Sequence, residues 1–191
     1  GFEELVQAVR GCWSSLWDPG HLVYRHRPTR PPNGPFIARA PAMAVVVQAM
    51  VAAEVAGVLF TADPVHGGAD EMMISAAWGL GETVVAGGAA DTYVVDRRGR
   101  LLRRALANKN SLIEQSPDGG TRSRRLRGAQ TGHACLSDGL LRRLAELGRE
   151  VEECLGSPQD IEWAAVGGRV VLLQARPITT GGLAPPGPRA G

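Results

Sequence analysis

Lysine is almost missing from this sequence, in which Lys109 is the only lysine among 21 basic residues. The excess of positive over negative charge is also small, with a formal net charge of +2. Proteins that bind nucleic acid concentrate positive charge to meet its phosphates. The overall charge therefore gives no support to a nucleic-acid partner.

Cysteine is scarce as well. Cys12, Cys135 and Cys154 lie far apart in the sequence, and no two of them form a C-x-x-C pair. An odd number of widely spaced cysteines predicts neither a disulfide framework nor a zinc site. This pattern is typical of a reducing compartment, so we expect a cytoplasmic protein.

Long apolar runs are missing too. No run approaches the roughly 18 residues that a membrane-spanning helix requires, and no basic-then-apolar leader opens the chain, so we expect no membrane partner. The 44% hydrophobic and 21% charged residues fit a globular protein of one domain, or a piece of a larger one. Because the first residues lack a methionine and enter a helical pattern at once, we expect an excerpt of a longer protein.

Helical periodicity occurs near both ends of the chain. An apolar stripe within residues 3–17 predicts a helix that ends at Asp18-Pro19-Gly20. Ser137 is a suitable N-cap for a second amphipathic helix, and Gly156 is expected to end it.

Strand patterns fill the middle of the sequence, so helices near the ends and strands between them predict an α+β fold. Residues 26–41 are expected to form an exposed loop, residues 116–127 are polar, basic and expected to be mobile, and residues 181–191 have a linker-like composition. The predicted strands are Met43–Val51, Gly57–Asp63, Asp70–Gly79, two strands around a turn at Arg98-Gly99, and a hairpin within Pro158–Thr180.

The C-terminal hairpin carries four polar side chains at regular positions among apolar ones. Asp160 and Glu162 share one face of its first strand, and Gln174 and Arg176 share a face of its second. Buried strand faces rarely carry such groups without partners or a function. The four residues are therefore the first candidates for a functional site.

The turn of this hairpin decides whether the two polar pairs meet. A three-residue loop at 167–169 would place Glu162 opposite Gln174 on one face of the sheet. A two-residue turn at Gly167-Gly168 would point the pairs to opposite faces unless a bulge intervenes. The functional interpretation thus requires an odd-length loop or a bulge.

Two interpretations fit the polar residues once they share a face. Glu162 and Gln174 offer hard oxygen atoms that suit Mg²⁺ held jointly with phosphates, and Arg176 can grip phosphate oxygens. The simpler alternative is a cross-strand ion pair between Asp160 and Arg176 on a solvated sheet face.

Six strings occur in one order along the sequence: VVVQAMV, GVLFTADP, AAWGLGETVV, DTYVVD, PQDIEWA and LLQARPIT. Together they resemble the ATP-binding domain of the phosphoenolpyruvate synthase (pyruvate, water dikinase) and pyruvate phosphate dikinase family, which rifampicin phosphotransferase shares. The resemblance implies a partial ATP-grasp domain over residues 1–180, followed by a linker-like tail, 181–191. It also implies ATP and Mg²⁺ as cofactors.

The resemblance assigns roles to individual residues. Glu162 and Gln174 match the magnesium and nucleotide ligands of the family, and Arg176 matches an arginine that faces the phosphates; the three are the expected catalytic residues. Gln48 matches a nucleotide contact, and Met50 and Val51 are expected along the adenine. The sequence also offers weaker candidates: the GLGE turn at 79–82 is read as a plain turn, Lys109 as a solvated side chain and His133 as a surface loop residue.

The resemblance further implies what the domain does in a whole enzyme. Mg-ATP would donate a phosphoryl group to a histidine on a separate swivelling domain, which passes it to pyruvate or, in the antibiotic-modifying relatives, to a rifamycin hydroxyl. An N-terminal lobe and the downstream domains are the expected partners, so the isolated chain is not expected to complete catalysis. A non-catalytic interaction module is the alternative from another class.

Overall fold

A computed structural model describes residues 1–18, 43–63 and 70–178 of the chain. The chain divides into two compact units, the N-terminal unit (residues 1–50) and the sheet unit (residues 51–191). The predicted loop at 26–41 and the linker-like tail at 181–191 lie outside the described residues.

The N-terminal unit contains α1 (Phe2–Ser14), which continues into a short 3-10 helix, η1 (Ser15–Trp17), and confirms the predicted first helix. The strand predicted at 43–51 is wrong, because residues 43–54 form neither helix nor strand. A strand is completed by the N–H and C=O groups of a partner strand, and the described residues supply no partner to this segment. The side chains of Val46 and Val47 are accordingly exposed.

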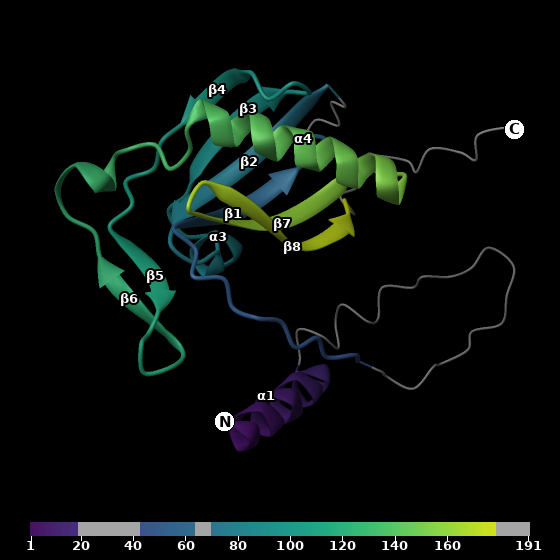
Figure 1. Ribbon diagram of the computed structural model, residues 1–191, viewed down its shortest axis with the longest axis vertical. Coiled ribbons are helices and arrows are strands. Elements are labelled where there is room, and N and C mark those ends of the chain that lie inside the picture. The colour runs from purple at the N-terminus through teal and green to yellow at the C-terminus, as the bar shows by residue number, and fades with distance from the viewer. Residues whose placement is uncertain (19–42, 64–69, 179–191) are drawn as a thin grey trace, which may run out of the picture. The chain divides into compact units, whose positions relative to one another are not determined.

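The sheet unit is built on one antiparallel sheet of six strands in the order β4-β3-β2-β1-β7-β8 (Figure 1). Strands β1, β2, β3 and β4 form a meander, and the β7–β8 hairpin pairs with β1 at the other side. The strands are β1 (Val55–Phe60), β2 (Glu71–Trp78), β3 (Asp91–Asp96), β4 (Leu101–Ala105), β7 (Gln159–Val166) and β8 (Arg169–Pro177).

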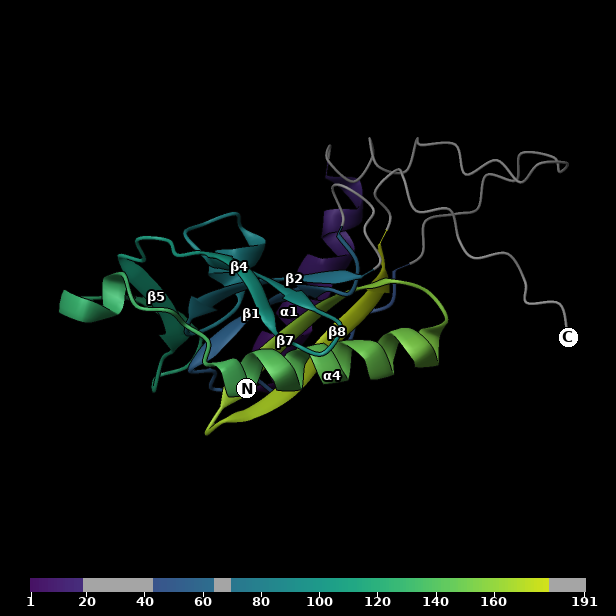
Figure 2. The same ribbon diagram turned by 90° about the horizontal axis from the view of Figure 1, so that it is seen from above.

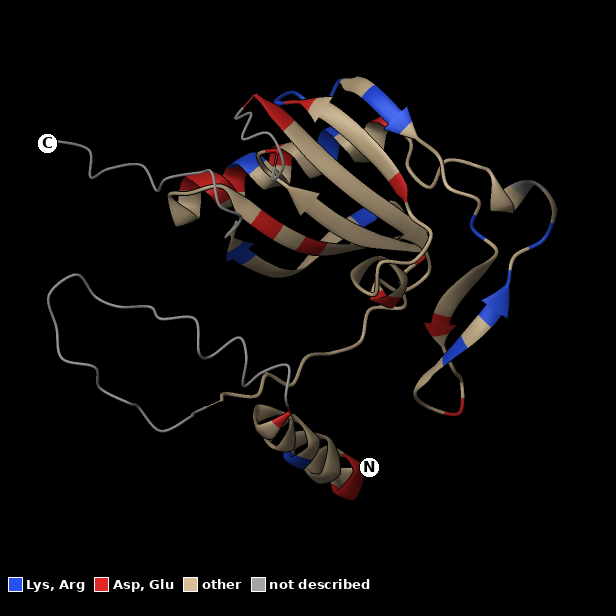
Figure 3. Cartoon of the chain, turned by 180° about the vertical axis from the view of Figure 1, so that it is seen from behind, with Lys and Arg blue, Asp and Glu red and all other residues tan. Residues whose placement is uncertain are grey.

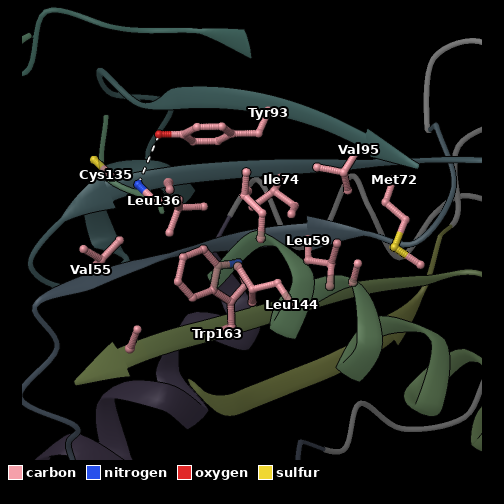
Figure 4. Close-up of a cluster of buried hydrophobic side chains, with 14 of the residues drawn as sticks. Val55, Leu59, Met72, Ile74, Tyr93, Val95, Cys135, Leu136, Leu144 and Trp163 are labelled. Carbon is pink, nitrogen blue, oxygen red and sulfur yellow. Dashed lines mark hydrogen bonds between the residues drawn. The ribbon is translucent and has the colours of Figure 1, made fainter. Parts of the chain in front are cut away.

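Helix α4 (Asp138–Leu155) lies along one face of this sheet, as the view from above shows (Figure 2). Its ends are as predicted: the Ser137 side chain accepts a hydrogen bond from the Leu140 amide, and Gly156 adopts a left-handed conformation (φ 74°) that suits glycine. The helix and the sheet enclose the hydrophobic core (Figure 4), whose members include Leu59, Met72, Ile74, Tyr93, Val95, Leu141, Leu144, Ile161 and Trp163.

A second, two-stranded sheet interrupts the chain between β4 and α4. It consists of β5 (Ser111–Gln115) and β6 (Thr121–Arg125), and is followed by a short 3-10 helix, η2 (Gly128–Thr131). The stretch 116–127, expected to be polar, basic and mobile, thus contains β6 and the turn before it. The two strands pair in register, and Glu114 holds two arginines of β6, a stabilisation that a count of polar residues does not reveal.

The sheet unit combines one long helix and the four-residue α3 (Glu82–Val85) with antiparallel strands, which agrees with the predicted α+β class. Within the described residues, no helix is long and apolar enough to cross a membrane.

Candidate functional site

The β7–β8 hairpin brings the four polar residues together through a bulge. Its turn is the two-residue Gly167-Gly168, since Val166 pairs with Arg169. Both glycines have positive φ angles (56° and 74°), as a tight hairpin turn requires. This turn alone would separate the polar pairs. The register shifts next to Glu162, however, where Leu173 is the extra residue, and the shift places Gln174 opposite Glu162 and Arg176 opposite Asp160.

Side chains along β7 point alternately to the two faces of the sheet, so its polar residues share one face. Ile161 and Trp163 point into the core beneath α4. Asp160 and Glu162 therefore point to the other face. We call Asp160, Glu162, Gln174 and Arg176 the polar platform; its two acidic residues show as red bands on β7 in the view from behind (Figure 3).

Glu162 and Gln174 offer free oxygen atoms at neighbouring positions. They are direct partners across an antiparallel pair, so their Cα atoms lie about 5 Å apart. Neither side chain makes a hydrogen bond or ion pair within the part of the chain that the structure describes. Two hard oxygen donors at this spacing can reach one Mg²⁺ ion, which commonly takes few protein ligands and completes its shell with phosphate oxygens and water.

Arg176 and Asp160 form the ion pair that the simpler interpretation expects. The Arg176 Nε and Nη2 atoms both lie 2.8 Å from the same carboxylate oxygen of Asp160. Asp160 is largely covered, with 12% of its side chain exposed, whereas 65% of Arg176 is exposed. The pair fixes the guanidinium on the platform and leaves most of its surface open to solvent.

The remaining predicted contacts lie outside the two strands that carry the platform. Gln48 and Met50 belong to the N-terminal unit, where both are exposed. Val51 begins the sheet unit and is half-buried, four residues before β1. The three remain predictions from the resemblance.

The glycine-rich turn at 79–82 serves the fold, in agreement with its reading as a plain turn. The amide of Gly79 donates to the Glu54 carbonyl (2.8 Å), and the amide of Leu80 donates to the Ile113 carbonyl (2.7 Å). A Cβ atom at Gly79 would lie 2.2 Å from that Ile113 oxygen. The first glycine is therefore needed for the close approach of β5.

The reading of Lys109 as a solvated side chain is wrong. Its exposed fraction is 1%, and its ammonium group pairs with the fully buried carboxylate of Asp91 and donates to the Ala107 carbonyl (3.1 Å). Asp91 also accepts hydrogen bonds from the Ala107 amide (2.9 Å), the Cys135 amide (2.9 Å) and the Tyr93 hydroxyl (3.0 Å). Sequence reasoning missed this buried network, for which the only signal is the rarity of lysine.

The Asp91 network clamps the segment that carries β5 and β6. Ala107 and Lys109 lie just before β5, and Cys135 and Leu136 lie after η2. Leu136 donates its amide to the Tyr93 hydroxyl (3.2 Å), so β3 holds both ends of this 107–136 excursion. The clamp positions the excursion on the sheet and does not face the platform's residues along β7 and β8.

The network makes the stability of the sheet unit sensitive to acid. Burial alone would raise the pKa of Asp91, but the hydrogen bonds from Lys109, the two amides and Tyr93 together lower it below its usual value. A lowered pKa means that the stabilisation is present above the unfolded-state pKa of about 3.9 and is lost as the pH falls through the folded-state pKa. In the parent chain, we expect the urea concentration at the unfolding midpoint to decrease once the pH is lowered below about 4. In Asp91→Asn this decrease should be smaller.

Two residues with reactive side chains lie outside the polar platform. Burial, followed by the nearby charge of Asp91, raises the pKa of the Cys135 thiol far above its usual range, so it stays protonated and unreactive. His133 is exposed in the loop before α4, as predicted.

Comparison with known proteins shows the family of the chain. Residues 1–186 match the family described as "Pyruvate phosphate dikinase, AMP/ATP-binding domain". The chain belongs to this family. This membership supports the expected ATP-binding domain.

Full-length relatives give the same result. The chain is 42% identical over 182 residues to a "Probable phosphoenolpyruvate synthase" of Methanothermobacter thermautotrophicus. This alignment covers 94% of the chain and 25% of the relative. It is 35% identical to the "Rifampicin phosphotransferase" of Bacillus cereus and 37% identical to the "Prodigiosin synthesizing transferase PigC" of Serratia marcescens. Each of these two alignments covers 94% of this chain and 20% of the relative. The chain thus spans a quarter or less of these relatives.

Proposed function

We propose that this chain is the part of an ATP-grasp module that holds Mg-ATP for phosphoryl transfer, as in a phosphoenolpyruvate synthase-like enzyme. The observation that carries the proposal is the polar platform, where a bulge aligns two free oxygen ligands and a tethered arginine on one sheet face. Membership of an ATP-binding family supplies the ligand.

Each platform residue has a role in this proposal. Glu162 and Gln174 would hold the magnesium ion, which would neutralise charge on the phosphates. Arg176, oriented by Asp160, would donate to phosphate oxygens and stabilise the negative charge that develops during transfer. Gln48, Met50 and Val51 are proposed nucleotide contacts on the resemblance alone.

The chain is proposed to need other parts for turnover. Phosphoryl transfer depends on positioning and on charges from several sides of the phosphates. The relatives are at least four times longer than the aligned region, which leaves room for a second lobe, a phosphohistidine domain and an acceptor domain. Pyruvate is the proposed final acceptor. A rifamycin hydroxyl is the alternative, since a rifampicin phosphotransferase is also a relative.

Thermal unfolding with Mg-ATP tests the proposal. A ligand at 100 times its Kd stabilises the folded state by about 2.7 kcal/mol, which raises Tm by roughly 5 to 10 °C for a chain of this size. We expect such a shift in the parent chain, and its loss in Glu162→Gln and Arg176→Gln.

Matched controls separate the platform from general charge effects. Arg169 lies on the same strand as Arg176 but next to the turn, and Glu150 lies on α4, so Arg169→Gln and Glu150→Gln should keep the full shift. A cooperative melt that Mg-ATP leaves unchanged, or equal shifts in the platform and control variants, would contradict the proposal and favour a non-catalytic interaction module.

A further inference from the structure

A cleft of about 420 Å³ opens at the end of the sheet where β1 begins. It is bordered by the entry to β1, the end of β2, the β5–β6 hairpin and η2. This volume lies within the range of small-molecule sites, about 300–1,000 Å³. The cleft is lined by Ala53, Glu54, Trp78, Gly79, Leu112, Glu114, Arg124, Leu126 and Gln130.

The cleft is separate from the polar platform. Glu54 donates its amide to the Ala165 carbonyl, so it lies beside the far end of β7. Asp160 lies five residues from Ala165 along that strand, which corresponds to about 17 Å. No platform residue lines the cleft.

The apolar part of the cleft is preformed. Leu112 and Leu126 are buried beneath it, with 7% and 4% of their surface exposed. The Trp78 indole Nε1 donates to the Gln130 carbonyl (3.2 Å), which holds the ring in place. Contact between β5 and the end of β2 depends on Gly79, as shown above, so the hairpin stands at a fixed distance from the sheet.

Two side chains of opposite charge, Glu54 and Arg124, line the cleft together with an apolar wall formed by Trp78, Leu112 and Leu126. The Glu54 carboxylate makes no hydrogen bond or ion pair with any described residue. On the hairpin side, Arg124 donates through its Nε to Glu114 (2.8 Å), and its terminal nitrogens make no hydrogen bond to a described residue. Hydrogen bonds from Arg124 and Arg122 lower the pKa of Glu114, so this carboxylate stays ionised and keeps Arg124 in place.

We propose that the cleft binds a small zwitterion with an apolar side chain, in chemical terms an α-amino acid of the phenylalanine kind. The ammonium group pairs with Glu54, beside the electron-rich face of an indole, and the carboxylate pairs with the terminal nitrogens of Arg124. The side chain packs on Trp78, Leu112 and Leu126. Such a ligand matches each uncommitted charge and the apolar wall together, whereas a simple cation or anion matches only one charge.

Titration with L-phenylalanine, followed through the Trp78 indole N–H signal in NMR spectra of the 191-residue chain, tests this assignment. We expect a saturable shift, at least tenfold weaker binding to Glu54→Gln and to Arg124→Gln, and at least tenfold weaker binding of phenethylamine, which lacks the carboxylate. Arg122→Gln is the matched control: it also removes an ion pair to Glu114 but does not line the cleft, so it should bind like the parent.

The alternative outcomes overturn the assignment. No saturable shift, parent-like affinity in either Glu54→Gln or Arg124→Gln, or equal binding of phenethylamine would each exclude the zwitterion site. Arg176→Gln should bind L-phenylalanine like the parent, so failure at the cleft and failure of the Mg-ATP proposal are read separately.

Discussion

Replacing Asp91 by alanine is expected to lower the free energy of unfolding by about 3–5 kcal/mol, the usual cost of leaving a buried charge without its partner. Domains of this size are stable by only about 5–15 kcal/mol, so the loss is a large share of the total. Asp91 is fully buried and accepts from Lys109, Tyr93 and the amides of Ala107 and Cys135. The variant leaves all four donors without their acceptor.

The partner variant Lys109→Met should cost less than Asp91→Ala. Without the lysine, the carboxylate of Asp91 still accepts three hydrogen bonds, which stabilise its charge. The double variant should be more stable than the sum of the single losses predicts, because the two charges interact directly.

Urea unfolding of the two single variants and the double variant at pH 7 measures these losses. Asp118→Ala is the control, since Asp118 is an exposed aspartate in the β5–β6 turn and should change the midpoint little. If Lys109→Met were the more damaging single variant, the charge of Lys109 rather than the acceptor role of Asp91 would dominate the network. If the losses added, the two charges would not be coupled.

Gly57→Ala is expected to destabilise the sheet unit by about 3 kcal/mol, at the upper end of the range for overpacked sites. A Cβ atom there would lie 1.9 Å from the backbone oxygen of Ser75 and 3.0 Å from Cζ2 of Trp163. Backbone atoms in the middle of a sheet cannot move aside as a flexible side chain can. Gly57 therefore lets the indole of the fully buried Trp163 lie against β1.

A second glycine in the same unit provides the control. Gly139 lies in the first turn of α4, where an added Cβ would meet only the Ser137 hydroxyl at 3.8 Å, an ordinary contact. Gly139→Ala should stabilise the unit by about 0.5–1 kcal/mol, because alanine favours the helix. Thermal melts of both variants measure the difference; similar melting temperatures would show that the sheet adapts at Gly57.

The rarity of a residue type is a poor guide to the functional site of this protein. Lys109, the only lysine, was expected to be a solvated side chain, yet it is part of the buried clamp on β3. The proposed function depends instead on polar residues at strand spacing, Glu162 and Gln174, whose side chains have no partner among the described residues.

The sequence by itself determined the elements whose cause is local. The Ser137 cap, the Gly156 end and the apolar stripe between them predicted α4, because capping and helical periodicity depend on residues a few positions apart. The alternation along 158–180 likewise predicted a hairpin with Asp160 and Glu162 on one face, since side chains in a strand alternate sides. Six ordered strings were enough to indicate the ATP-binding family.

Only the tertiary structure decided whether the two polar pairs meet, because a two-residue turn and a bulge at Leu173 together set the register, and the bulge forms against β7. It also decided that residues 43–51 form no strand and that Lys109 is buried. Each outcome depends on partners distant along the chain: a neighbouring strand for the first, and Asp91 for the second. Local sequence patterns determine which side chains share a face of a helix or strand. Tertiary packing determines which of these faces come together.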